Sequence, residues 1–158
     1  MSKQNKMIYI FWILTAAGVG FLSGILSRTG IDAFSRDALQ PPMSPPSFLF
    51  PVVWTILYTL MGISAARVYL ASGENQNRNG LNLYVLQLII NFFWSPIFFN
   101  AGAYGFAFLW LLLLWVLVLM MILMFRKTDP LAAALQIPYL IWLTFALYLN
   151  WGVYYLNK

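Results

Sequence analysis

The chain has 158 residues, of which 62% are hydrophobic and only 8% are Asp, Glu, Lys or Arg, with a formal net charge of +5. Soluble domains average about 25% charged residues. So few charges cannot cover a soluble protein of this size, and the composition predicts a membrane protein. His and Cys are absent, which excludes imidazole or thiolate metal sites and nucleophilic catalysis by either residue.

The first apolar run covers residues 7–27 and is bracketed by Lys6 and Arg28. About 20 apolar residues of helix cross a bilayer core about 30 Å thick, so this run is long enough to span it. It exceeds the roughly 7–15 residue apolar region of a signal peptide, and no clear cleavage site follows. We expect a retained transmembrane helix over residues 7–28.

A charged and proline-rich segment follows at residues 29–47. It holds Asp32, Arg36 and Asp37, and four prolines stand within positions 41–46. Proline fixes φ and removes a hydrogen-bond donor, which disfavours helix. The segment is predicted to be a stiff, extended loop that could act as a lid.

Four more helices are expected, over residues 48–70, 81–99, 104–125 and 131–155. A polar turn at residues 71–80 separates the first two of them. The 47 residues from 79 to 125 carry no charge, which is enough for two spans, and the Asn and Gly residues within positions 100–105 favour a break there. The sequence therefore predicts an all-α membrane protein, a single integral domain built as a five-transmembrane-helix bundle.

Five spans place the two termini on opposite sides of the membrane. The N-terminal side collects six basic residues, and the other side collects three. The six are Lys3, Lys6, Arg67, Arg78, Arg126 and Lys127, and the three are Arg28, Arg36 and Lys158. The positive-inside rule then predicts a cytoplasmic N-terminus. Basic residues scattered at helix ends also argue against a nucleic-acid partner.

Small residues recur every four positions on the first helix, at Ala16, Gly20 and Gly24. Such a stripe lets another helix backbone approach closely. Packing inside the monomer and dimerisation through the same stripe are both open interpretations.

The third helix carries two amides and two aromatic rings on one face, at Gln87, Asn91, Trp94 and Phe98. Amides in hydrocarbon need hydrogen-bond partners, so this face is expected to point into the bundle. Interhelical hydrogen bonding and ligand contact are equally good explanations. Pro96 on the same helix predicts a kink.

The second and fifth helices also present an aromatic stripe, led by Trp54 with Tyr58 and by Trp142 with Ala146 and Leu149. Tyr139 and Asn150 flank the stripe on the fifth helix. An aromatic stripe alone is more often core than site. Three of them beneath a proline loop predict a largely apolar pocket with few polar groups, suited to a flat hydrophobic ligand.

The end of the fifth helix satisfies a loose cholesterol-contact pattern with Leu149, Tyr154 and Lys158. An interfacial aromatic belt of Trp151, Tyr154 and Tyr155 explains the same residues. Sterol is therefore a weak partner candidate.

Three ordered motifs carry a family resemblance that covers nearly the whole chain. They are QPPMSPPSFLFPVVWTILY at 40–58, QLIINFFWSPIFF at 87–99 and PYLIWLTFALYLN at 138–150. These residues resemble the tryptophan-rich sensory protein family, also known as the TspO, mitochondrial translocator protein or peripheral-type benzodiazepine receptor family.

The resemblance implies a five-helix protein of a bacterial cell membrane, commonly a homodimer. Such proteins bind protoporphyrin IX and isoquinoline carboxamide or benzodiazepine ligands, without a resident cofactor. The motif positions that correspond to ligand contacts are Trp54, Tyr58, Asn91, Trp94, Trp142, Phe145, Ala146 and Leu149, with Ser23 and Gly24 completing the wall and Phe98 added from the third-helix face.

The loop departs from the family pattern, which usually reads Lys-Pro-x-Trp-x-Pro-Pro-x-Trp. Gln40 stands in place of the Lys, Met43 of the first Trp and Phe48 of the second. A cation for a porphyrin propionate and two stacking indoles are therefore missing.

A membrane receptor or sensor for porphyrins and similar flat ligands is the leading functional hypothesis. One alternative is light- and oxygen-dependent porphyrin degradation through Trp54 and Trp142, since no side chain offers ordinary acid–base or nucleophilic catalysis. The other is a facilitated tetrapyrrole or sterol carrier. Ion-coupled transport is disfavoured because the expected helices contain no acidic residue.

Overall fold

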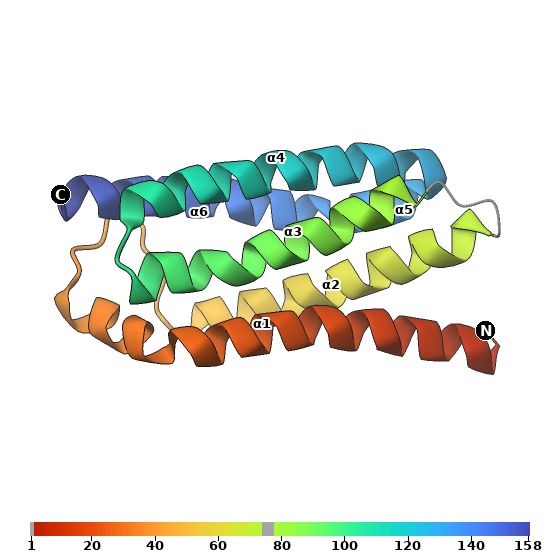
Figure 1. The fold of residues 1–158 in the computed structure, drawn as a ribbon, viewed down its shortest axis with the longest axis horizontal. Helices are drawn as coiled ribbons and strands as arrows, with labels where there is room; N and C mark the ends of the chain where they lie inside the picture. The colour runs from red at the N-terminus through yellow and green to blue at the C-terminus, as the bar shows by residue number, and fades with distance from the viewer. Residues whose placement is uncertain (1, 74–77) are drawn as a thin grey trace.

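The structure is a computed structural model that describes residues 2–73 and 78–158. Its elements are α1 (Lys3–Asp37), α2 (Leu49–Ser72), α3 (Asn79–Ser95), the π-helical turn η1 (Pro96–Asn100), α4 (Tyr104–Thr128), α5 (Pro130–Leu135) and α6 (Ile137–Leu156). Five stretches are long and apolar enough to cross a membrane, with α3 and η1 forming one and α5 and α6 another. The predicted all-α, five-helix architecture is confirmed (Figure 1).

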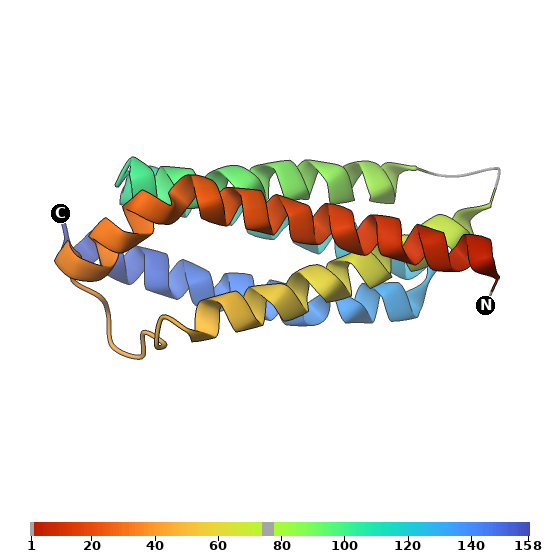
Figure 2. The ribbon, with the colours of Figure 1, turned by 90° about the horizontal axis from the view of Figure 1, so that it is seen from below.

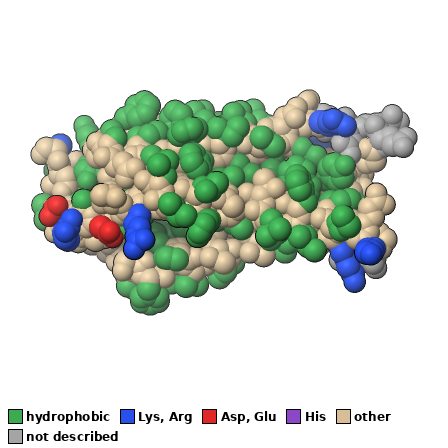
Figure 3. Space-filling model, turned by 60° about the horizontal axis from the view of Figure 1, so that its bottom comes forward, with side chains coloured by type: hydrophobic (Ala, Val, Ile, Leu, Met, Phe, Trp, Pro, Cys, Tyr) green, Lys and Arg blue, Asp and Glu red, His purple; other side chains and the backbone are tan. Residues whose placement is uncertain are grey.

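The helices lie side by side, with the N-terminus at one end of the bundle and the C-terminus at the other (Figure 1). The closest neighbours are α1 with α2, α3 with α4, and α4 with α6. On the face drawn in Figure 3, basic side chains gather at both ends, and the acidic side chains visible among the described residues lie at one end. Between the ends the surface carries no charged side chains on this face, as expected of a bundle surrounded by lipid.

The first helix is longer than the sequence suggests, because α1 continues to Asp37 and the proline loop shrinks to residues 38–48. The first charge after the apolar run ends the hydrophobic stretch but does not end the helix. No proline stands between Arg28 and Asp37. Phe34 packs against Phe98 and Phe99 with ring centroids 5.3 Å apart, which holds this extension on η1.

Two prolines interrupt the third and fifth spans in different ways. At Pro96 the helix changes to a π-helical turn, which is the local form of the kink predicted from the sequence. The fifth span was expected to be continuous, but Gln136 separates α5 from α6. Pro138 has no N–H for the carbonyl of Ala134, and the Gln136 N–H bonds to the carbonyls of Ala133 and Ala134 in a tight turn, which explains the break.

The stripe on α1 divides between the inside and the outside of the monomer. Ala16 is fully buried, and a Cβ on Gly20 would overlap the Tyr58 ring. A Cβ on Gly62 of α2 would likewise overlap the Ile13 backbone. Gly24 is exposed, with nothing near its missing Cβ. Packing within the monomer therefore accounts for two of the three stripe residues.

One ion pair fastens α2 to the start of α5. The Arg67 guanidinium lies 2.8 Å from the Asp129 carboxylate, and Asp129 also accepts hydrogen bonds from the N–H groups of Leu131 and Ala132 as the N-cap of α5. The Ser64 hydroxyl donates to the Ala132 carbonyl at 2.7 Å. These contacts secure the short α5 segment against α2. The expected polar turn at residues 71–80 lies partly outside the described residues, at 74–77.

Candidate functional site

A chain of buried hydrogen bonds joins α2, α3 and α6 near the middle of the bundle. The Tyr58 hydroxyl donates to Asn91 Oδ1 at 2.6 Å. Asn91 Nδ2 donates to the Tyr139 hydroxyl at 2.8 Å, and that hydroxyl donates to Gln87 Oε1 at 2.9 Å. We call these four residues the central network. It connects a tyrosine from each of two helices through the two amides of the third.

The central network shows which groups the Asn91 and Gln87 amides bond to. Hydrocarbon offers no water, so each buried polar group has to find a protein partner. Asn91 uses its oxygen toward Tyr58 and its nitrogen toward Tyr139. In this structure the amide therefore forms interhelical hydrogen bonds, and its contact with a ligand stays a prediction.

Trp54 forms an aromatic wall over the central network. Its ring stacks on Tyr58 with centroids 5.4 Å apart and planes 28° apart. It also meets the edge of Tyr139 at 6.1 Å. Trp54 is half-buried, whereas Tyr58 and Tyr139 are buried. The indole thus packs against both tyrosines of the central network.

Trp94 and Phe98 form a second aromatic pair, at the end of the bundle nearer the proline loop. Their rings stack at 5.0 Å. The Trp94 indole N–H donates to Asn150 Oδ1 at 3.2 Å, and Asn150 Nδ2 donates to the Tyr104 carbonyl at 2.8 Å. This pair therefore links α3 and η1 to α6 and to the first turn of α4.

Trp142 belongs to a third aromatic group, which faces the start of α2. It meets the edge of Phe50 at 5.9 Å and lies 5.7 Å from Phe145. Phe145 in turn stacks on Tyr148 at 6.2 Å. The three predicted tryptophans thus have different aromatic partners on the inner sides of α2, α3 and α6.

The proline loop is tied to α6 and to the turn that follows it. Leu39 exchanges two hydrogen bonds with the Asn157 side chain, at 2.9 and 2.8 Å. The Tyr148 hydroxyl donates to the Pro42 carbonyl at 2.8 Å. Pro41 is buried against Gly152, where a Cβ would have no room. We call these contacts the loop clamp; Figure 2 shows the loop beside the C-terminal end of α6.

The three loop positions that depart from the family pattern all face outward. Gln40 is exposed, and the side chains of Met43 and Phe48 are 81% and 70% exposed. Met43 also has a positive φ of 67°, a conformation that is uncommon for a residue other than glycine. The substituted side chains therefore lie on the outer surface of the loop.

The remaining predicted site residues differ in their surroundings. Ser23 is buried, and its hydroxyl donates to the Phe92 carbonyl at 2.7 Å. Ala146 and Leu149 are half-buried on α6. Gly24 is exposed on α1, which separates it from the aromatic groups inside the bundle.

Sequence reasoning underrated Tyr139, which flanks the predicted stripe but is the centre of the network in the structure. Its position one turn before Trp142 was the available signal, since residues three apart share a helix face. The loop clamp was missed altogether. Polar residues such as Asn157, at the end of a spanning helix, look like ordinary interfacial residues in the sequence.

The end of α6 carries aromatic contacts instead of a recognisable ligand site. Trp151 and Tyr154 lie 5.6 Å apart, and the Lys158 ammonium lies 4.4 Å from the centre of the Tyr155 ring. These contacts fit the interfacial-belt interpretation of this segment.

Two grooves on the outside of the bundle contain none of the predicted ligand residues. One, of about 330 Å³, lies between α3 and α4, and the other, of about 240 Å³, lies between α1 and α3. Among the described residues no group of three or more Asp and Glu side chains could hold a metal ion. The chemistry available inside the bundle is therefore aromatic stacking and hydrogen bonding by amides and hydroxyls.

Comparisons with known proteins agree over the full length. The family model described as the TspO/MBR family matches residues 11–156. The tryptophan-rich protein TspO of Chlorobaculum tepidum is 34% identical over 164 residues, covering 99% of both chains. Protein CrtK of Rhodobacter capsulatus is 41% identical over 155 residues, covering 98% of this chain and 95% of the relative. The human translocator protein is 36% identical over 117 residues, covering 73% and 69%.

Proposed function

The chain belongs to the TspO/MBR family, and on that premise we propose that it is a membrane receptor or sensor that binds porphyrins and similar flat hydrophobic ligands inside the bundle. Five spanning helices and bacterial relatives make it a multi-pass integral protein of a bacterial membrane. The proposal extends to protoporphyrin IX and isoquinoline carboxamides as ligands and to a homodimer as the assembly.

The observation that carries the proposal is the wall formed by Trp54 and Tyr58 above Asn91. A flat, apolar ligand needs large aromatic faces and only a few polar groups to orient it. Trp54 and Tyr58 supply stacked faces 5.4 Å apart, and Asn91 supplies an amide directly beneath them. A ligand carbonyl or carboxylate would replace the Tyr139 hydroxyl as the partner of the Asn91 N–H.

The third aromatic group supports an entry from the loop end. Trp142 and Phe145 are in contact on α6, and Phe50 meets Trp142 from the start of α2. The proline loop leads directly into that start of α2. A ligand passing beneath the loop would meet these rings before it reached Trp54.

Titration of the purified protein with protoporphyrin IX in darkness tests the proposal through absorbance and tryptophan fluorescence. Darkness keeps any photochemical loss of pigment out of the measurement. Trp54→Ala and Trp142→Ala are each expected to weaken binding about tenfold, because a large stacking surface is lost.

Trp151→Ala is the matched control, since it removes an indole from the same helix as Trp142 but from a position that is 51% exposed. It should bind protoporphyrin as the wild type does. Wild-type affinity in both Trp54→Ala and Trp142→Ala would contradict the proposed pocket.

A further inference from the structure

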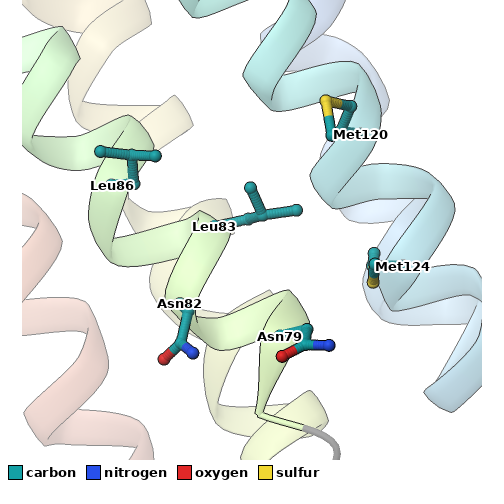
Figure 4. Close-up of a pocket in the computed structure, with 6 residues that line it drawn as sticks. All are labelled: Asn79, Asn82, Leu83, Leu86, Met120 and Met124. Carbon is teal, nitrogen blue, oxygen red and sulfur yellow. The ribbon is translucent and has the colours of Figure 1, made fainter.

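The groove between α3 and α4 lies away from the central network and has one polar and one apolar part. It has a volume of about 330 Å³. Asn79 and Asn82 come from the first turn of α3, whereas Leu83, Leu86, Met120 and Met124 form the apolar walls. Figure 4 shows these side chains on the two helices that border the groove. The amides lie at the end of the span and the apolar walls extend toward its middle.

Two basic residues lie close in the chain to residues that line this groove. Lys127 follows Met120 by seven residues and Met124 by three, so it continues the groove face of α4 by one turn. Arg78 directly precedes Asn79. Both cations are exposed, and their flexible stems can reach toward the mouth of the groove.

Negative charge to offset these cations is scarce at this end of the bundle. Among the described residues there, Asp129 is the one acidic side chain, and it is already paired with Arg67 at 2.8 Å. Glu74 lies outside the described residues, and even when it is counted, the six basic residues assigned to this end of the chain outnumber the acidic ones, so we expect a net positive charge here. A partner with a negative headgroup would be attracted to it.

The groove between α1 and α3 differs from the α3/α4 groove in its lining. Its lining is apolar apart from Thr15, whose hydroxyl donates to the Phe11 carbonyl. Neither an amide nor a cation lines it. Both grooves lie on the outside of the bundle, but the one between α3 and α4 has amides at one end, with basic residues close to its lining residues in the chain.

We propose that the α3/α4 groove binds one anionic phospholipid. The phosphate lies between Lys127 and Arg78, Asn82 hydrogen-bonds the glycerol ester region, and an acyl chain follows the walls formed by Leu86 and Met120. Charge complementarity selects this occupant over a neutral lipid, and the length of the apolar walls selects it over a free anion.

Native mass spectrometry of the purified full chain tests this, with phosphatidylglycerol and phosphatidylcholine of identical acyl chains as probes. The wild type should retain one phosphatidylglycerol in preference to phosphatidylcholine. Lys127→Gln should weaken phosphatidylglycerol retention about fivefold, as expected for one basic residue at a membrane surface. Lys6→Gln makes the same charge change at the same end of the bundle on α1 and should have no effect.

A second pair of variants tests the groove itself. Leu86→Trp fills the α3/α4 groove, whereas Val85→Trp fills the α1/α3 groove from the neighbouring position. Both side chains are exposed, at 42% and 47%, so both variants should fold. Only Leu86→Trp should abolish the phosphatidylglycerol preference.

Three results would overturn the proposal. Equal retention of the two lipids by the wild type would remove the charge selection. An equal loss in Lys6→Gln and Lys127→Gln would indicate nonspecific attraction to the whole basic end. A Leu86→Trp variant that keeps its lipid preference but loses dimer would assign the groove to a second copy of the chain.

Discussion

The central network and the loop clamp both use a few side-chain hydrogen bonds to join distant helices, but they do so in different solvents. Tyr58, Asn91 and Tyr139 are buried within the apolar span, where no water can replace a lost bond. Asn157 and Tyr148 bond the loop where it is exposed, and water can take over. The central network is therefore held firmly, whereas the proline loop can be released from α6 at low cost.

The largest effect is expected from Asn91→Leu, which removes the amide that bonds both tyrosines of the central network. The Tyr58 hydroxyl loses its acceptor and stays buried, which costs about 2–3 kcal/mol of unfolding free energy. Thermal or detergent-induced unfolding measures this. Asn82→Leu, on the same helix but exposed, should be nearly neutral. Equal stability of the two variants would contradict the claim that the buried hydrogen bonds of Asn91 stabilise the fold.

Gly20→Ala tests the same region by overpacking. The new methyl would overlap the Tyr58 ring and push its hydroxyl away from Asn91, for a loss of about 1–2 kcal/mol. Gly24→Ala, four residues further along α1, adds the same methyl where nothing lies within 4 Å. Unfolding midpoints of the two proteins should separate clearly. If they coincide, the close packing of α1 on α2 does not support the network.

Asn157→Ala tests the loop clamp and should have a smaller global effect. Its two hydrogen bonds to Leu39 are lost. Because water replaces them, the free energy of unfolding should fall by only about 0.5–1 kcal/mol. Local opening should rise much more, which hydrogen exchange at the Leu39 amide measures. Unchanged exchange at Leu39 would mean that Asn157 does not hold the loop.

Tyr148→Phe should have the smallest effect, because it removes a single exposed bond to the Pro42 carbonyl. We expect a stability change below about 0.5 kcal/mol. Combined with Asn157→Ala, however, it should increase loop proteolysis more than the two single changes predict, since both residues hold the same segment. Strict additivity in limited proteolysis would show that the two anchors act independently.

Helix boundaries were predictable where local residue types mark them. The break expected within positions 100–105 contains the observed connection between η1 and α4, because Asn and Gly stand between two full-length apolar runs. The end of α1 was missed by nine residues, since a charge ends an apolar run but does not by itself end a helix. The break at Gln136 was also missed, although Pro138 was visible in the sequence.

The candidate site was predictable in its residue types but not in its pairings. Periodicity placed Asn91, Trp54 and Trp142 on inward faces. It could not say that Asn91 bonds two tyrosines from different helices, nor that Tyr139 is the hub between its amide and Gln87. Those pairings depend on how far each helix rotates and how closely it approaches its neighbours.

The sequence by itself determined that this protein is an all-α bundle of five spans, because the length of an apolar run is measured against a bilayer of nearly constant thickness. It also determined that thiol and imidazole chemistry is absent, because the chain contains no Cys and no His. Only the tertiary structure decided that the loop is held by Asn157, which is 118 residues away from Leu39 in the chain. Hydrogen bonds between helices are set by three-dimensional packing, and no local pattern in a single helix encodes its partner.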